Sequence, residues 1–137
     1  MTTPLYYESH GSGEAVVFIH GFTLDRRMWQ PQIADFAQHY RVIAYDQRGF
    51  GKSPLPTGEY SHTDDLAALL DSLQIESATL VGLSRGGSVA LNFALAHPQR
   101  VAGLVLVDSV LEGQRWSEEQ RTQDQFVFDQ AQTAGID

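Results

Sequence analysis

Short apolar runs alternate along the chain with segments in which apolar residues recur at helical spacing. Four of the runs are rich in leucine or β-branched residues and are bounded by Gly, Asp or Ser: residues 16–19, 42–45, 78–81 and 103–107. Unbroken runs of this kind are typical of parallel strands that are buried on both faces. The pattern therefore predicts an α/β fold in which a mostly parallel sheet is flanked by helices on both faces.

One further strand is expected near the N-terminus. Residues 5–9 show a weaker alternation of apolar and polar positions, and Gly11-Ser12-Gly13 follows them as a turn signal. We expect this segment to form a hairpin with the strand at 16–19 and so to become an antiparallel edge of the sheet.

Three segments between the strands are predicted to be helices: residues 30–39, 61–73 and 85–96. The first tolerates Pro31, because the N–H that proline lacks is unused in the first turn of a helix. Ser61 and Asp64 match a capping pair at the start of the second. The third is apolar around most of its circumference and is stopped by Pro98, which predicts a buried helix.

The composition changes at Glu112. The last 26 residues hold six acidic residues against two arginines, and glutamines replace aliphatic residues. Ser117 and Gln120 form a capping signature for a helix. That helix would hold one apolar cluster, made of Phe126, Val127 and Phe128. We divide the chain into residues 1–111, the N-terminal portion of the α/β core, and residues 112–137, the start of a lid or docking helix.

Composition narrows the possible classes of protein. The chain has 137 residues, of which 42% are hydrophobic and 10% aromatic, as expected for one folded domain. A formal net charge of −8, with Lys52 as the single lysine, argues against nucleic acid as a partner. The absence of cysteine excludes disulfides and thiolate metal sites. No apolar run has the length of a membrane span and the N-terminus lacks a signal-peptide pattern, so we expect a soluble cytoplasmic protein without membrane contact.

The pentapeptide Gly82-Leu83-Ser84-Arg85-Gly86 carries the candidate chemistry. It directly follows the strand at 78–81 and opens the helix at 85–96, which is the context of a nucleophile elbow. Its two glycines allow strand and helix to approach closely, and the sharp turn strains the serine backbone so that the hydroxyl projects alone. The helix N-terminus supplies free N–H groups where an oxyanion would develop. The alternative interpretation is that Ser84 only caps the helix.

Two further motifs follow the first two buried strands. His20-Gly21-Phe22 comes directly after residue 19, and the octapeptide Asp46-Gln47-Arg48-Gly49-Phe50-Gly51-Lys52-Ser53 comes directly after residue 45. The octapeptide ends like a phosphate-binding loop, but such a loop requires glycine where this chain has Asp46. A nucleotide-binding function is therefore excluded for this segment.

The three motifs stand in the order found in the α/β-hydrolase family, and residues 4 to about 110 resemble the N-terminal half of its esterase, lactonase and haloperoxidase-like branch. The resemblance implies a serine hydrolase that cleaves carboxylic esters through an acyl-enzyme at Ser84. It also implies that the N–H groups of Phe22 and Arg85 form the oxyanion hole, and that His20 and Gly21 support that loop. In the family, the remaining half supplies a lid, two more strands, usually the triad acid, and the catalytic histidine.

Ser84 needs an adjacent base to become a nucleophile. His20 is interpreted as a structural residue of its loop. The other histidines are interpreted as solvated surface residues: His10, His39, His62 and His97. We therefore expect the base to come from a second subunit, from a separate chain that completes the fold, or not at all.

Asp108 is a candidate for the triad acid. It directly follows the strand at 103–107, at the edge where ligand sites of open α/β sheets form, and some dehalogenase relatives carry their triad carboxylate there. The alternative is that its side chain only caps the following turn.

Two alternatives to an enzyme are kept. A non-catalytic fold remnant or assembly module would retain the elbow without a base, and the strand at 103–107 would leave an exposed edge for a second copy or the acidic tail to cover. A flavodoxin-like ligand-binding module would explain the alternation of strands and helices but not the three motifs together. For the enzyme we expect a small apolar ester as substrate and no cofactor or metal. Its partner would be a second copy in a homodimer or other homo-oligomer, or a complementing C-terminal chain.

Overall fold

The computed structural model describes residues 4–109 and 117–133. Its strands are β1 (Tyr7–His10), β2 (Ala15–Ile19), β3 (Arg41–Tyr45), β4 (Ala78–Leu83) and β5 (Val101–Val107). Its α-helices are α1 (Gln30–Phe36), α2 (His62–Ser72), α3 (Arg85–Ala96) and α4 (Glu118–Thr133), and short 3₁₀ helices occupy η1 (Arg26–Trp29) and η2 (Pro98–Arg100).

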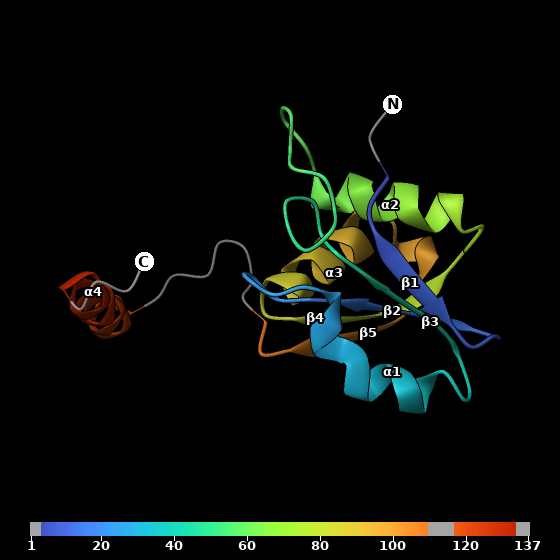
Figure 1. The fold of residues 1–137 in the computed structure, drawn as a ribbon, viewed down its shortest axis with the longest axis horizontal. Helices are drawn as coiled ribbons and strands as arrows, with labels where there is room; N and C mark the ends of the chain where they lie inside the picture. The colour runs from blue at the N-terminus through green and yellow to red at the C-terminus, as the bar shows by residue number, and fades with distance from the viewer. Residues whose placement is uncertain (1–3, 110–116, 134–137) are drawn as a thin grey trace.

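The strands form a five-stranded sheet in the order β1-β3-β2-β4-β5 (Figure 1). β2, β3, β4 and β5 are parallel to one another, and β1 is antiparallel to β3. The carboxyl ends of the parallel strands therefore meet at one edge of the sheet. The predicted fold class, a mostly parallel sheet with an antiparallel N-terminal edge strand, is confirmed.

The expected hairpin between residues 5–9 and β2 is wrong. β1 pairs instead with β3, with Tyr7 opposite Tyr45 and His10 opposite Val42. β2 has no free edge, because β3 and β4 occupy its two sides. The N-terminal strand is therefore displaced to the outer edge of β3.

Side chains of the central strands alternate between two layers. On β2, Val16 and Phe18 are buried in one cluster with Trp29 at the start of α1. Val17 and Ile19 are buried in the other cluster, which contains the apolar faces of α2 and α3. α1 covers one face of the sheet, and α2 and α3 cover the other (Figure 1). The predicted helices on both faces are confirmed.

The predicted helices at 61–73 and 85–96 are present. Ser61 caps α2, because its Oγ accepts a hydrogen bond from the Asp64 N–H at 3.2 Å. α3 begins at Arg85 and ends at Ala96. The predicted buried helix is found in part: Val89, Ala90 and Phe93 of α3 are buried, whereas Leu95 is 73% exposed. The sheet covers one side of α3 and α2 covers another, which leaves part of its circumference open.

α1 is shorter than the predicted helix and is preceded by the unexpected turn η1. It ends at Phe36, because the chain must turn back within a few residues to enter β3. The carbonyls of Ala37 and Tyr40 lie where a Cβ at Gly11 would be placed. The turn before β2 therefore packs directly on the end of α1.

β5 lies at the edge of the sheet, as the sequence predicts. Its side chains from Leu104 to Val107 are between 36% and 46% exposed, on both faces of the strand. Apolar side chains on both faces are typical of a strand inside a sheet, so β5 has the composition of an inner strand in the place of an edge strand.

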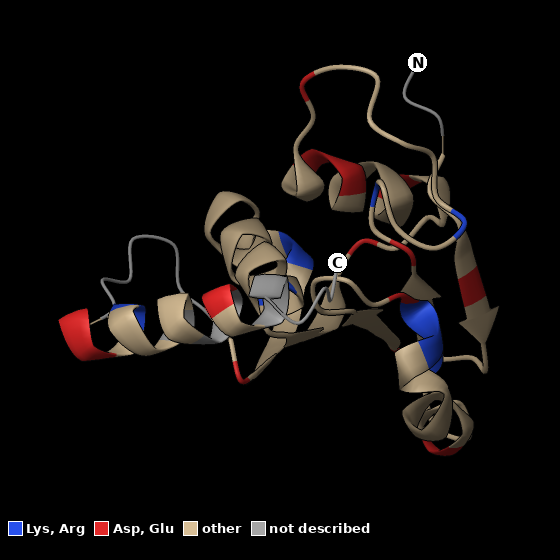
Figure 2. Ribbon diagram, turned by 60° about the vertical axis from the view of Figure 1, so that its left-hand side comes forward, with Lys and Arg blue, Asp and Glu red and all other residues tan. Residues whose placement is uncertain are grey.

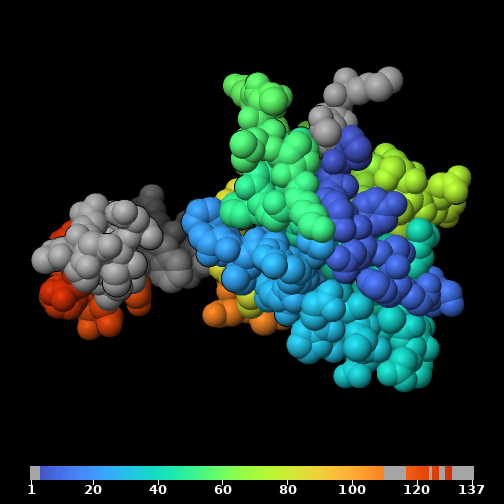
Figure 3. Space-filling model, viewed as in Figure 1, coloured from blue at the N-terminus to red at the C-terminus, as the bar shows by residue number. Residues whose placement is uncertain are grey.

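α4 stands apart from the sheet and its covering helices (Figures 1 and 3). The predicted capping pair is present, since the Gln120 N–H donates to Ser117 Oγ at 3.1 Å. Acidic positions recur along this helix (Figure 2), and Phe126 is 62% exposed. The side chains of Val127 and Phe128 and the predicted boundary at residue 111 lie outside what the structure describes. None of the described helices is both long and apolar enough to cross a membrane.

Candidate active site

Ser84 occupies the turn between β4 and α3 in a backbone conformation that side chains rarely adopt. Its φ is 50° and its ψ is −117°. The conformation is held from both sides, because the Ser84 N–H donates to the Val107 carbonyl at 2.9 Å and the Gly87 N–H donates to the Ser84 carbonyl at 2.9 Å. The Ser84 side chain makes no capping hydrogen bond to α3. The alternative in which Ser84 only caps the helix therefore finds no support.

Glycines allow the elements around Ser84 to touch. A Cβ at Gly82 would collide with the backbone of Gly86 and Gly87, and a Cβ at Gly86 would collide with the carbonyls of Ile19 and His20. The first turn of α3 thus packs against both β4 and the end of β2. Gly87, which sequence reasoning missed, has the Ser109 side chain where its Cβ would be. The signal for it in the sequence is that Gly87 directly follows Gly86, the last residue of the pentapeptide.

The loop after β2 presents an unused backbone donor. The Leu24 N–H donates to the Gly21 carbonyl at 3.3 Å, and Thr23 adopts a left-handed φ of 61°, so residues 21–24 form a tight turn. Within residues 4–109 and 117–133, no group accepts a hydrogen bond from the N–H of Phe22 or from the N–H of Arg85. Because Gly86 packs on the end of β2, these two free donors belong to segments in direct contact.

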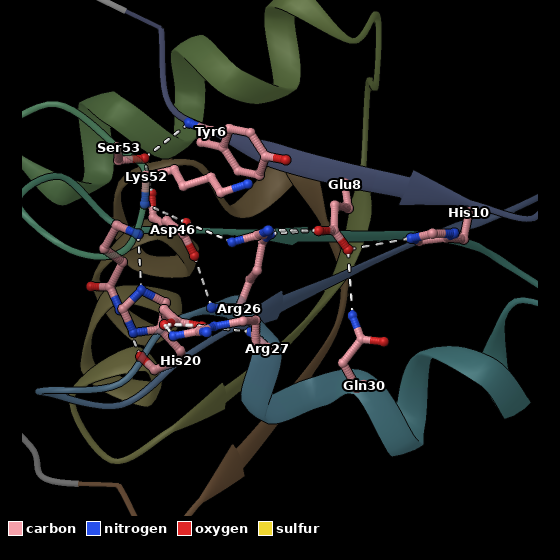
Figure 4. A network of polar contacts seen from close by, with 12 residues as sticks. Tyr6, Glu8, His10, His20, Arg26, Arg27, Gln30, Asp46, Lys52 and Ser53 are labelled. Atoms are coloured by element: carbon pink, nitrogen blue, oxygen red, sulfur yellow. Dashed lines mark hydrogen bonds and ion pairs between the residues drawn. The ribbon is translucent and has the colours of Figure 1, made fainter.

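His20, which directly follows β2, is completely buried, and its side chain takes part in the network of polar contacts in Figure 4. The Gln47 N–H donates to its Nε2 at 2.9 Å, so Nε2 carries no proton, and Nδ1 donates to the Gly21 carbonyl at 2.8 Å. Burial lowers the pKa of His20 below its ordinary value of 6.5. A neutral imidazole with both nitrogens bound to backbone is suited to holding the loop, and it has no free nitrogen for Ser84.

The octapeptide after β3 forms a buried anchor around Asp46 (Figure 4). The Asp46 carboxylate accepts hydrogen bonds from the Lys52 N–H at 2.8 Å and from the Arg26 N–H and Nη1 at 2.9 Å each. Ser53 Oγ accepts from the Tyr6 N–H at 2.9 Å, and Arg26 also pairs with Glu8 at 2.7 Å. The turn therefore ties together β1, η1 and the end of β3. Arg26 was missed by sequence reasoning, because nothing in the sequence separates it from the exposed Arg27.

Arg48 of the same octapeptide contacts α2, in the helix layer on the opposite face of the sheet from α1. Its Nε donates to the Asp65 Oδ2 at 2.8 Å, its Nη2 pairs with the Asp65 Oδ1, and both side chains are buried. The pKa of the neighbouring Tyr45 hydroxyl is raised by burial and by the Asp65 charge. This ion pair fixes the start of α2 relative to the end of β3.

His62 differs from the expected surface residue. It is half-buried, and its Nε2 lies 2.7 Å from Nη2 of Arg85. Burial and the Arg85 charge lower its pKa below 6.5. The expectation is wrong because the packing of α2 on α3 brings the first residue of α2 beside the first residue of α3.

The remaining histidines lie away from the elbow. His10 on β1 is exposed and lies 3.6 Å from Glu8, and His39 after α1 is exposed. His97 ends α3, the opposite end from Ser84, and packs on Phe93 with 4.9 Å between ring centres. All histidines of the chain are among the described residues, and none is hydrogen-bonded to Ser84.

Asp108 begins the segment after β5, next to the carbonyl that binds the Ser84 N–H. It is exposed and adopts a left-handed φ of 46°. Its carboxylate makes no hydrogen bond with any residue that the structure describes, so it does not act as the cap of the following turn there. Across the same residues, no group of three His, Asp or Glu side chains is arranged to hold a metal ion. The absence of a metal requirement stays a prediction.

Both the sequence and the structure of this chain are similar to those of known proteins. The family model described as alpha/beta hydrolase fold matches residues 14–135. The chain is 36% identical over 139 residues to 3-oxoadipate enol-lactonase 2 of Acinetobacter baylyi, with 95% of this chain and 52% of that protein covered. It is 34% identical over 139 residues to a haloalkane dehalogenase of Mesorhizobium japonicum, with 98% and 45% covered.

A similar solved structure is that of a thermophilic esterase from Thermogutta terrifontis with malate bound. The two share 37% sequence identity and superpose with a TM-score of 0.76, covering 93% of this chain and 47% of the esterase. The chain thus spans about half the length of the relatives that it matches.

Proposed function

Because the chain belongs to the α/β-hydrolase fold family, we propose that it carries the nucleophile and oxyanion hole of a serine hydrolase that acts on carboxylic esters. The observation that carries the proposal is the strained Ser84, whose hydroxyl is left without a capping bond at the turn between β4 and α3. In the proposed reaction Ser84 Oγ attacks the ester carbonyl, its proton passes to a base, and the alcohol departs with a proton from that base. Water then hydrolyses the acyl-enzyme and releases the acid.

The free N–H groups of Phe22 and Arg85 are the proposed oxyanion hole. Both are backbone donors, and both lack an acceptor within the described part of the chain. Fixed donors stabilise the negative charge that develops on the carbonyl oxygen, and one such donor contributes about 3–4 kcal/mol in comparable sites. His20 and Gly21 would hold the Phe22 donor in place, and Gly82 and Gly86 the Arg85 donor.

The base is proposed to come from polypeptide that packs on β5. No histidine of this chain is bound to Ser84, and the relatives are about twice as long as the chain. The apolar side chains of β5 from Leu104 to Val107 are exposed beside the Ser84 turn. We infer that the second half of the fold, within one polypeptide or in a separate one, adds to this edge and supplies a histidine. Asp108, next to the same edge, is the proposed triad acid.

The test combines a reactive-serine probe with native mass spectrometry. The protein is isolated under native conditions, its mass identifies any accompanying polypeptide, and the assembly is treated with a fluorophosphonate. We expect labelling of Ser84 and hydrolysis of p-nitrophenyl esters, both lost in Ser84→Ala. Equal hydrolysis by the wild type and Ser84→Ala would refute the proposal.

A non-catalytic assembly module is the second candidate. The observation that favours it is that, among the described residues, no histidine is bound to Ser84, together with the exposed β5 edge. This candidate predicts an assembly in which folded protein leaves Ser84 unlabelled by the probe.

A further inference from the structure

The side chain of Arg85 lies in a cluster built from several segments. Its guanidinium carbon is 5.4 Å from the centre of the Phe22 ring and 5.7 Å from that of Phe50. Its Nη2 is 2.7 Å from His62 Nε2, and the Tyr60 ring meets the His62 ring edge-on at 5.1 Å. We call these residues the Arg85 cluster: Phe22, Phe50, Tyr60, His62 and Arg85. Phe22, Phe50 and Arg85 follow the carboxyl ends of β2, β3 and β4, and Tyr60 and His62 lie just before and at the start of α2. The cluster therefore lies at the edge of the sheet that carries Ser84.

Arg85 has no carboxylate partner in the described part of the chain. Ion pairs are formed there by Arg26, Arg27, Arg48 and Arg100. Asp65, on the same helix as His62, is already bound by Arg48 in two places. A guanidinium offers several N–H donors, and His62 accepts only one of them.

Arg85 is a half-buried cation without an ion pair among the described residues, in a chain whose formal net charge is −8. Because the formal charge of the chain as a whole is negative, a guanidinium beside the Ser84 turn offers a local site that attracts an anionic group of a substrate. Arginine is suited to this task, because its planar fork binds a carboxylate through two hydrogen bonds. The Phe22 ring, which is 58% exposed, gives the guanidinium an apolar wall on one side.

His62 fixes where the guanidinium points. Arg85 donates to His62 Nε2, so that nitrogen is unprotonated, and the half-buried position keeps the imidazole neutral. The hydrogen bond and the two aromatic contacts together hold the Arg85 side chain at the edge of the sheet. His62 is therefore a positioning residue for Arg85.

We propose that the Arg85 side chain binds a carboxylate of the substrate, so that the ester cleaved at Ser84 carries an acidic group. This inference rests on the proposed function, because it takes Ser84 as the reacting residue. It replaces the small apolar ester expected from the sequence with an ester of a dicarboxylic or other acidic compound. Removing the side chain leaves the Arg85 backbone N–H, and hence the proposed oxyanion donor, in place.

The test measures binding and needs no turnover. Benzoate and its neutral counterpart benzamide are titrated into the protein, and the Nε–Hε signal of Arg85 is followed by NMR. We expect a saturable shift with benzoate and none with benzamide. Affinity for benzoate, measured by calorimetry, should fall at least about tenfold in Arg85→Met.

Matched variants separate a specific site from a general effect of charge. Arg121→Met, on the exposed face of α4, removes the same charge and should leave benzoate affinity unchanged. His62→Leu should weaken benzoate binding several-fold, and His62→Gln, which keeps an acceptor, should restore it. Equal affinity in the wild type and Arg85→Met, or a wild type that does not bind benzoate, would overturn the inference. Benzoate binding without hydrolysis would instead count against the proposed function alone.

Discussion

At the scale of one residue, the backbone conformation of Ser84 lowers the stability of the folded protein. Its φ of 50° with ψ of −117° lies in a region that only glycine occupies at low cost, and such strain amounts to about 1–3 kcal/mol. The surrounding hydrogen bonds and close backbone contacts keep the residue there. Under the proposed function, this conformation presents the Ser84 hydroxyl, and relaxing the backbone would stabilise the protein but withdraw the hydroxyl from the site.

Replacing Ser84 should expose this strain. We expect Ser84→Gly to have a free energy of unfolding about 1 kcal/mol higher than Ser84→Ala, because glycine relieves the backbone and alanine does not. Urea denaturation of the two variants measures the difference. A glycine variant no more stable than the alanine variant would show that Ser84 is unstrained.

The glycines beside Ser84 carry a second prediction at this scale. A Cβ at Gly82 would meet the backbone of Gly86, which cannot move without displacing α3, so Gly82→Ala should lower the free energy of unfolding by about 3 kcal/mol. Gly58 has nothing within 4 Å of such a Cβ, and Gly58→Ala is the matched control, with a change of less than about 0.5 kcal/mol. Thermal denaturation compares them, and equal losses would contradict the packing argument.

At the scale of elements, buried polar contacts set how the layers meet. The Asp46 anchor joins β1, η1 and the end of β3, and the pair of Arg48 with Asp65 joins that end to α2. Apolar packing alone would let helices slide on the sheet, whereas a bidentate ion pair fits one position only. The loops that end at the proposed active site are therefore fixed by side chains outside it.

Breaking the pair of Arg48 and Asp65 should be costly. Asp65→Asn leaves the Arg48 guanidinium buried without its countercharge, and the free energy of unfolding should fall by about 3–5 kcal/mol. Arg27→Met, which breaks the exposed pair with Asp25, should cost far less, because water replaces the lost partner. Chemical denaturation measures both variants. Similar decreases in their free energies of unfolding would mean that burial does not make the pair of Arg48 and Asp65 more important for stability than the exposed pair.

The buried His20 and the half-buried His62 predict how the free energy of unfolding depends on pH. Burial lowers the pKa of His20 and of His62 below 6.5, so the unfolded chain binds these protons at a higher pH than the folded chain. Their contribution to stability is complete above pH 6.5 and is lost as the pH falls through the lowered values. His62 faces the charges of Arg85, Asp65 and Arg48 and the ring of His20, of which only Asp65 opposes the shift.

Unfolding measured at pH 7 and pH 5 tests this dependence. Stability should be lower at pH 5, and His62→Gln should reduce the loss. The exposed His39, replaced by Gln, serves as the control and should leave the pH dependence unchanged. An identical pH dependence in the wild type and His62→Gln would show that His62 does not contribute to the pH dependence of stability.

At the scale of the whole molecule, the β5 edge, which no described residue covers, is the feature that most affects the state of association. Its exposed apolar side chains and unpaired backbone groups favour pairing with another strand. For a protein made of these 137 residues alone, a second copy is the available partner. The chain on its own is therefore expected to self-associate through β5.

A charge on this edge should prevent the association. Val105→Lys places a charged ammonium group on β5, at a position where the native valine is 46% exposed. The variant should be monomeric in analytical ultracentrifugation, because pairing through β5 would bury this charge. Leu55→Lys, at a loop position that is 75% exposed, adds the same charge elsewhere and should leave the association unchanged. A wild type that stays monomeric at high concentration would rule out pairing through β5.

The sequence by itself determined the parallel strands, the bounds of α3, those of α2 to within one residue, and the place of Ser84 between β4 and α3. These features depend on local patterns: apolar runs, capping pairs, and glycines flanking a serine. Only the tertiary structure decided that β1 pairs with β3, that Arg26 and not Arg27 is buried, and that His62 meets Arg85. Each of these depends on which edges and faces remain free once the layers have packed, and that information is not present in any single segment of the chain.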